Sequence, residues 1–139
     1  MSCPHSHLSL LDKVQRRAER LITSVCQRGE AVTVLDTLKH RRQVASLTVF
    51  HKAQILHTPH LTDLRLPWRQ SIRNTRSVLA NSCQVEVPRS HTSTHQRSFS
   101  VTTSKLWNLM TTEINVRHLN TNHMKSAANI WCKQYANST

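Results

Sequence analysis

Near the N-terminus, apolar residues recur at alternating intervals of three and four positions: Leu11, Val14, Ala18, Leu21 and Val25. This spacing places all of these side chains along one stripe of an α-helix. Basic residues stand between them: Lys13, Arg16, Arg17 and Arg20. The pattern predicts an amphipathic helix over residues 9–26 whose apolar stripe packs against another helix. Its basic face fits either a solvated surface or a surface that lies against a phosphate backbone.

A second helix is predicted over residues 34–57, with Asp36 or Thr37 helping to cap its start. Its apolar residues form a broad face: Leu38, Val44, Ala45, Leu47, Phe50, Ile55 and Leu56. The Thr58–Pro59 step ends this helix, because proline disfavours helix in the residue before it and cannot continue the hydrogen-bond ladder. Gly29 suits the left-handed residue that closes the first helix. We therefore expect the two helices to form an antiparallel hairpin.

The segment that follows, residues 59–82, reads as a basic irregular linker. Its arginines recur every three or four residues and enclose a tryptophan: Arg65, Trp68, Arg69, Arg73 and Arg76. Pro67 opposes one continuous helix through this segment. Basic side chains around an aromatic ring are typical of a surface that contacts nucleic acid. A solvated loop, basic because the whole protein is basic, explains the same residues equally well.

Two short strands and two helices are expected in the C-terminal part. Residues 83–87 alternate apolar and polar side chains before Pro88, and residues 98–103 are expected to pair with them as a second strand. A short helix over residues 104–110 buries Leu106, Trp107 and Met110. A last helix over residues 121–135 carries one apolar stripe: Met124, Ala127, Ala128, Trp131 and Tyr135.

The fold class predicted from these segments is mainly α, a helical hairpin plus C-terminal helices with a small two-stranded β element. The chain divides into four parts. Residues 1–8 are a disordered or truncated lead-in, residues 9–58 the basic helical hairpin, residues 59–82 the basic linker, and residues 83–139 the β element followed by two helices. A length of 139 residues fits one small domain with one modest core.

The charge of the chain limits its partners. Lys and Arg number 19 against 7 Asp and Glu, which gives a net charge of +12. Such an excess attracts RNA, DNA and anionic membranes. The chain has no apolar run of about 18 residues that would span a bilayer, and its start lacks the features of a signal peptide. We therefore expect an intracellular protein of the nucleus or cytoplasm, neither secreted nor in the membrane, with reduced cysteines.

Side chains that would support catalysis are dispersed along the chain. Asp12, Asp36 and Asp63 lie far apart and none adjoins another acid, whereas two-metal chemistry needs neighbouring carboxylates. The single glycine, Gly29, excludes glycine-rich phosphate loops and the G-x-S-x-G nucleophile turn. We therefore predict no catalytic residue and no cofactor, and we do not expect the chain to be an enzyme on its own.

Two groups of cysteine and histidine are the candidate metal ligands in the sequence. They are Cys3 with His5 and His7, and Cys83 with His91 and His95. Neither group has the ligand spacing or the fourth ligand of a structural zinc site. We therefore predict no metal site.

Five blocks of the sequence, taken in order, resemble the C-terminal region of reverse transcriptases from non-LTR (LINE-type) retrotransposons. The blocks are LDKVQRRAERLI, LKHRRQVASLTVFHK, VEVPRSHTSTHQRSF, TTSKLWNLM and MKSAANIWC. Together they cover about residues 8–135. The resemblance implies a fragment of a transposable-element protein that lies downstream of the polymerase core of an RNA-directed DNA polymerase. The paired aspartates of that core are absent here, so the upstream core is the missing partner.

The chain departs from the family at several positions. His40 stands where the family has glutamate, His51 stands where tyrosine is usual, and no proline follows the block that ends at Met110. The resemblance implies a position beside the template and primer, with contacts to RNA or DNA backbone phosphate. The residues expected to make these contacts are Arg16, Arg17, Arg20, Arg41, Arg42, Trp68, Arg69 and Arg73. The alternatives are a small helical protein-interaction module or a transposon relic with no selected function.

Overall fold

The computed structural model describes residues 4–25, 36–70 and 83–137. In this part the chain is mainly α-helical and contains no β-strand. Its elements, in chain order, are α1 (His5–Val25), α2 (Leu38–Gln54), the 3-10 helix η1 (Pro59–Leu64), α4 (Ser93–Gln96), α5 (Phe99–Glu113) and α6 (Thr121–Asn137). The prediction of a mainly α fold is confirmed.

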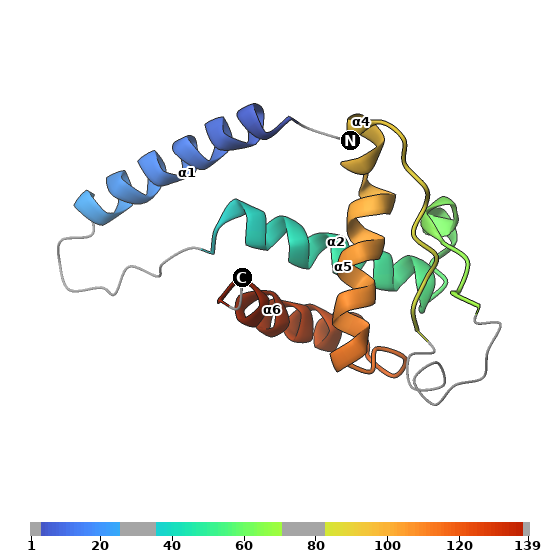
Figure 1. Ribbon diagram of the computed structural model, residues 1–139. Coiled ribbons are helices and arrows are strands. Elements are labelled where there is room, and N and C mark those ends of the chain that lie inside the picture. Colours follow the sequence, from blue (N-terminus) through green and yellow to red (C-terminus); the bar gives the residue numbers. More distant parts are fainter. Residues whose placement is uncertain (1–3, 26–35, 71–82, 138–139) are drawn as a thin grey trace.

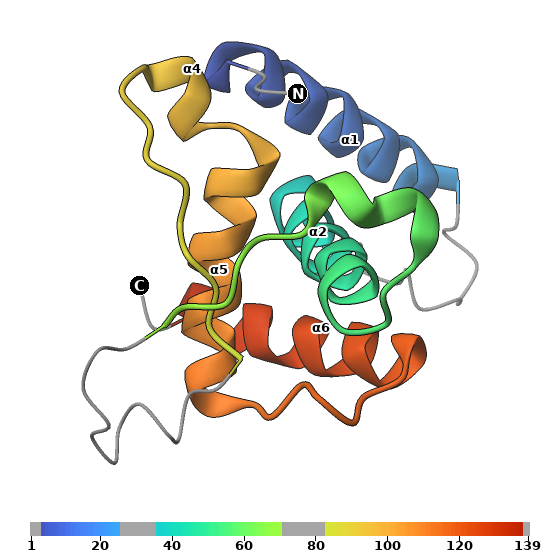
Figure 2. The same ribbon diagram turned by 90° about the vertical axis from the view of Figure 1, so that its right-hand side faces the viewer.

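Helix α2 lies at the centre of the fold and contacts α1, η1, α5 and α6. Figure 2 looks nearly along α2, with α1 above it, α6 below it and α5 beside it. Figure 1 shows that α1 stands farther from the body than the other long helices do. The fold therefore consists of a three-helix body with one peripheral helix.

The hydrophobic core is shared by α2, α5 and α6. Its largest fully buried apolar side chains are Trp107, Phe50, Leu47, Met110 and Met124. The rings of Phe50 and Trp107 meet edge to face with their centroids 5.1 Å apart, a geometry that aromatic pairs prefer. The predicted burial of Trp107 and Met110, and that of Met124 on the last helix, is confirmed.

Helix α1 begins earlier than its apolar stripe predicts. The carbonyl oxygen of Pro4 accepts hydrogen bonds from the N–H groups of His7 and Leu8, at 3.1 and 3.2 Å. Proline suits the first positions of a helix because its φ angle is already helical and its missing N–H is not needed there. Residues 5–8, which we expected in a disordered lead-in, are therefore helical. Gly29 lies outside the described residues.

Helix α2 is closed at both ends by local hydrogen bonds. The Oγ1 atom of Thr37 accepts a hydrogen bond from the N–H of His40 at 3.2 Å, so the predicted cap is confirmed. After the helix, His57 has a φ angle of 50°, and the N–H of Thr58 donates to the Lys52 carbonyl oxygen at 3.1 Å. This bond reaches back six residues, one more than the corresponding bond of the Schellman motif, but as in that motif a left-handed residue, usually glycine, closes the helix. Here a histidine takes it.

The prediction of a two-stranded β element is wrong. Residues 98–103 lead into and begin helix α5, where Val101, Ser104 and Trp107 follow helical spacing into the core. The preference of β-branched residues for strands is weak, and packing on one buried helical stripe outweighs it. Residues 83–87 are extended, but they pair with residues 67–69 through one isolated antiparallel bridge between Trp68 and Val85.

Side chains of α5 supply the other contacts of this extended segment. The Asn108 Oδ1 atom accepts a hydrogen bond from the Val85 N–H, and Asn108 Nδ2 donates to the Val85 carbonyl oxygen, both at 2.9 Å. The indole Nε1 of Trp107 donates to the carbonyl oxygen of Cys83 at 2.8 Å. Two helical side chains therefore occupy the place where we expected a second strand.

The packing predicted for the apolar stripe of α1 is also wrong. No residue of α1 is buried, and Val14, Leu21 and Val25 are 66%, 59% and 82% exposed. The residues of α1 that are half-buried form a different stripe: Leu8, Asp12, Gln15 and Glu19. The physical reason is a polar contact: Gln15 of α1 is hydrogen-bonded to Asp36 and Arg41 at the start of α2. This contact turns the apolar stripe to the solvent.

Candidate nucleic-acid interface

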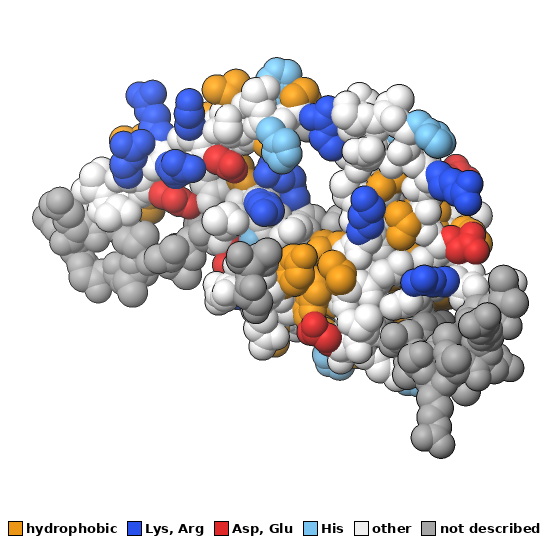
Figure 3. All heavy atoms as spheres, in the orientation of Figure 1, with side chains coloured by type: hydrophobic (Ala, Val, Ile, Leu, Met, Phe, Trp, Pro, Cys, Tyr) orange, Lys and Arg blue, Asp and Glu red, His pale blue; other side chains and the backbone are white. Residues whose placement is uncertain are grey.

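The basic residues predicted on the first helix form one exposed stripe. Lys13, Arg16, Arg17 and Arg20 are all exposed, and Figure 3 shows Lys and Arg side chains gathered over α1. Within this stripe, Nε of Arg20 donates a local hydrogen bond to the carbonyl oxygen of Arg16 at 3.3 Å. Among the described residues, these cations make no ion pair with a carboxylate. Their charge is therefore available to an anionic partner.

Helix α2 adds Arg41 and Arg42, both exposed. The Nη2 of Arg41 donates to Oε1 of Gln15 at 2.8 Å, and Nε2 of Gln15 donates to the carbonyl oxygen of Asp36 at 3.4 Å. These two bonds hold the polar side of α1 against the start of α2. The structure thus brings Arg41 beside the helix that carries the basic stripe.

Asp36 joins α2 to α6. Its carboxylate lies 3.1 Å from Nζ of Lys133 and 3.8 Å from Nε2 of His40. The same His40 nitrogen is hydrogen-bonded to Oδ1 of Asn129 at 2.5 Å. Because the start of α2 meets the end of α6 here, the two helices are antiparallel. His40 thus contacts both Asp36 and Asn129 at this junction.

A groove of about 940 Å³ runs between α2 and α6. Arg41 and Lys52 of α2 and Lys125 of α6 line it, together with Asp36 at one end. Neither Lys52 nor Lys125 is among the contact residues predicted from the sequence. No local pattern relates these two lysines, because only the antiparallel packing of α2 and α6 brings their helices together.

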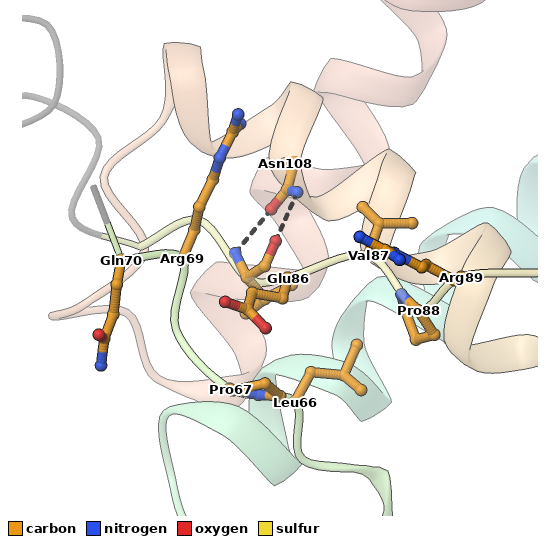
Figure 4. Close-up of a pocket in the computed structure, with 10 residues that line it drawn as sticks. Leu66, Pro67, Arg69, Gln70, Glu86, Val87, Pro88, Arg89 and Asn108 are labelled. Carbon is orange, nitrogen blue, oxygen red and sulfur yellow. Dashed lines mark hydrogen bonds between the residues drawn. The ribbon is translucent and has the colours of Figure 1, made fainter. Parts of the chain in front are cut away.

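Trp68 and Arg69 lie in a second region, away from α1. Arg69 lines a pocket of about 780 Å³ together with Leu66, Pro67, Gln70, residues 85–89 and Asn108 of α5. In Figure 4, Arg69 and Arg89 lie on opposite sides of Glu86. Trp68 is 38% exposed, and Nη1 of Arg69 donates to Oε1 of Gln84 at 3.4 Å.

The eight predicted contact residues therefore do not form one surface. Arg16, Arg17, Arg20 and Arg41 lie on or beside α1, and Arg42 follows on α2. Trp68 and Arg69 belong to the segment that follows η1, and Figure 1 shows this green segment on the side of the molecule away from α1. Arg73 lies outside the described residues.

The described residues contain no group of three His, Cys, Asp or Glu side chains arranged to hold a metal ion. Cys83 and Cys132 are buried free thiols. Burial raises the pKa of the Cys132 thiol above its ordinary value, which keeps it protonated and unreactive near neutral pH.

Comparison of the chain with protein-family models, with curated proteins and with solved structures finds no match. Within the described ranges, no helix has both the length and the apolar composition needed to cross a membrane.

Proposed function

We propose that this chain is a C-terminal, reverse transcriptase-like fragment of a non-LTR retrotransposon protein that binds RNA or DNA through the phosphate backbone. The observation that carries the proposal is the exposed stripe of Lys13, Arg16, Arg17 and Arg20 on α1, with Arg41 beside it. The five blocks that resemble the family support the same origin. In this proposal the chain acts in the nucleus or cytoplasm and has no catalytic step of its own, since polymerase chemistry belongs to the upstream core.

The proposed binding is electrostatic and has little sequence preference. Each phosphate that a lysine or arginine neutralises releases counterion, so affinity falls steeply as salt rises. Contacts to phosphate fix the position of the nucleic acid but carry no direct information about its sequence. A helix that presents four cations along one stripe is suited to this mode, because its charges follow a line as the phosphates do.

The test is a salt titration of binding to a mixed-sequence, fluorescently labelled oligonucleotide. We expect the wild-type chain to bind at low salt and to lose affinity linearly on a double logarithmic plot. Replacing Arg16, Arg17 and Arg20 with glutamine should make the slope shallower by about 2 if each cation neutralises one phosphate of a single strand.

The matched control replaces three exposed cations elsewhere, Lys39, Arg97 and Lys105, with glutamine. It removes the same total charge, so it should weaken binding less than the α1 variant does. The proposal is contradicted if the wild-type chain does not bind at low salt, or if its affinity does not depend on the salt concentration.

A second candidate function, a helical protein-interaction module, is favoured by one observation. The apolar stripe of α1 is exposed, with Leu11, Val14 and Leu21 all more than half exposed at 51%, 66% and 59%. An amphipathic helix can place such a face in the apolar groove of a protein partner. Sedimentation of the purified chain separates the two candidates: a stable oligomer without nucleic acid favours the interaction module, and a monomer that binds oligonucleotide favours the first proposal.

A further inference from the structure

The groove between α2 and α6 is lined by polar residues of both helices and by Val44, Ala45 and Val49 of α2. On α2, the lining residues Arg41, Ala45, Thr48 and Lys52 follow a spacing of three and four, and on α6 Asn122, Lys125 and Asn129 do the same. Residues at this spacing lie on the same side of a helix. The hollow forms where small side chains, Ala45 and Ser126, stand between longer ones.

The charges along the groove are predominantly positive. Arg41, Lys52 and Lys125 are cationic, and the acid that lines the groove, Asp36, has Lys133 3.1 Å from its carboxylate. The remaining polar lining consists of the His40 imidazole and of hydroxyl and amide groups; the hydroxyl and amide groups can donate hydrogen bonds to phosphate oxygens without adding charge. The groove therefore combines cations and neutral donors, a composition suited to a polyanion.

The first turn of α6 strengthens this field at one end. Thr121 and Asn122, the first residues of this 17-residue helix, line the groove. The first N–H groups of a helix have no acceptor within the helix and carry partial positive charge. In α6 the N–H of His123 already donates to Oδ1 of Asn120 at 2.8 Å. Anions are stabilised at such a position, and Lys52 and Lys125 line the same groove.

The length of the groove along α2 suits a short single strand of nucleic acid. Axes of packed helices typically lie about 8–10 Å apart, so α2 and α6 are in contact and the groove is a furrow along the outer side of their seam. Arg41 and Lys52 are eleven positions apart on α2, which is about 16 Å at 1.5 Å per residue. This is the length of about five stacked nucleotides at roughly 3.4 Å each. Val49 and Ala45 offer apolar contacts for sugars or bases along it.

We infer that the groove between α2 and α6 binds a single strand of RNA or DNA, with its phosphates at Lys52, Lys125 and Arg41. The inference rests on the proposed function and gives it a second contact surface, distinct from the basic stripe of α1. Arg41, which lines the groove and bonds to Gln15 of α1, connects the two surfaces.

Lysine footprinting on the unaltered chain tests this inference. The full-length protein is acetylated briefly with and without a saturating single-stranded oligonucleotide, and each lysine is quantified by mass spectrometry. We expect the oligonucleotide to slow acetylation of Lys52 and Lys125 at least threefold. Lys39 and Lys105, exposed and outside the groove, are internal controls whose rates should change less.

A pair of matched variants gives a second measurement. Lys52→Gln with Lys125→Gln should weaken single-strand binding about tenfold and make the salt slope shallower by about 1.4. Lys39→Gln with Lys105→Gln removes the same charge and should weaken binding less than threefold. Circular dichroism establishes that both variants are folded.

The outcomes separate the inference from the proposed function. If the wild-type chain binds a single strand but Lys52 and Lys125 are not protected, the groove inference is overturned and the proposed function stands. If the chain binds duplex but not single strands, the groove inference is overturned as well. If no nucleic acid binds at low salt, the proposed function itself fails.

Discussion

At the scale of single residues, the histidines His51 and His57 both affect the stability of the fold. His51 is fully buried in the core, and its Nε2 lies 3.2 Å from the carbonyl oxygen of Val116. That contact requires a proton on Nε2, while Nδ1 has no hydrogen-bond partner in the described structure. Burial lowers the pKa of His51 below its ordinary value, because the charged form would leave a second donor unpaired in an apolar site.

The first prediction concerns the stability of the fold at acidic pH. Because the pKa of His51 is lowered on folding, the unfolded chain binds a proton that the folded chain does not. The free energy of unfolding should therefore fall as the pH drops below the ordinary value of 6.5, by at most about 1.4 kcal/mol per pH unit for one proton. Urea unfolding at a series of pH values measures this.

The control for the other histidines is His51→Gln. The glutamine amide can replace the imidazole as a hydrogen-bond donor, but it does not titrate. It should be less stable than wild type at neutral pH and should lose less stability on acidification. Parallel curves for the two proteins would show that His51 does not cause the pH dependence.

The second prediction concerns His57, whose φ angle of 50° is unfavourable for any residue with a Cβ atom. Replacing it with glycine removes that strain at the closure of α2. We expect the free energy of unfolding to rise by about 0.5–1 kcal/mol, the strain relieved less the greater chain entropy of glycine. His60→Gly, at an exposed position of η1, should lower it. A loss of stability in His57→Gly would contradict this account.

At the scale of elements, α1 shows how a helix can be predicted correctly and oriented wrongly. Its length and apolar stripe are local properties of the sequence, but its docking depends on Gln15 meeting Asp36 and Arg41 of another helix. These polar contacts involve residues distant in the chain, and hydrophobic periodicity does not report them. The apolar stripe is consequently solvent-exposed in the chain as it stands.

The third prediction follows from this orientation. Val14 and Leu21 are exposed, so replacing both with glutamine should change the free energy of unfolding by no more than about 0.5 kcal/mol per site. Replacing Leu47, which is fully buried, with alanine should lower the free energy of unfolding by about 2–5 kcal/mol. Urea unfolding of the two variants compares them. A large loss in the α1 variant would mean that the stripe is covered in solution.

The sequence allowed some parts of the site to be predicted and not others, for the same reason. Arg16, Arg17 and Arg20 could be assigned to one surface, because a single helix brings them together. Lys52 and Lys125 could not be assigned to one surface, since their proximity in space depends on the antiparallel contact of α2 with α6. The extended residues 83–87 were recognised from alternation, but their partners, residues 67–69 and Asn108, are set by tertiary packing.

At the scale of the whole molecule, the net charge of +12 acts on folding and on binding in opposite directions. Like charges repel one another more in the compact chain than in the unfolded one. Salt screens this repulsion, since the Debye length falls from about 30 Å at 0.01 M to about 8 Å at 0.15 M. The same salt weakens attraction to nucleic acid.

The fourth prediction is therefore a pair of opposite responses to sodium chloride. Between about 0.01 and 0.15 M, the midpoint of urea unfolding should rise while the affinity for an oligonucleotide falls. Both are measured on the same preparation of the wild-type chain. An unfolding midpoint that falls with salt would show that favourable ion pairs, rather than repulsion, dominate the folded state.

The amide of Asn108 has a consequence for the behaviour of the chain in concentrated solution. An unpaired strand edge can recruit an extended segment from another molecule and start aggregation. On one side, the carbonyl oxygen of residue 84 accepts from the N–H of residue 69, and the N–H of residue 86 donates to the carbonyl oxygen of residue 67. On the other side, the Asn108 amide is hydrogen-bonded to both the N–H and the carbonyl oxygen of Val85. Neither edge of this short segment therefore offers Val85 to a neighbouring molecule, and one helical side chain keeps the extended segment closed to intermolecular pairing.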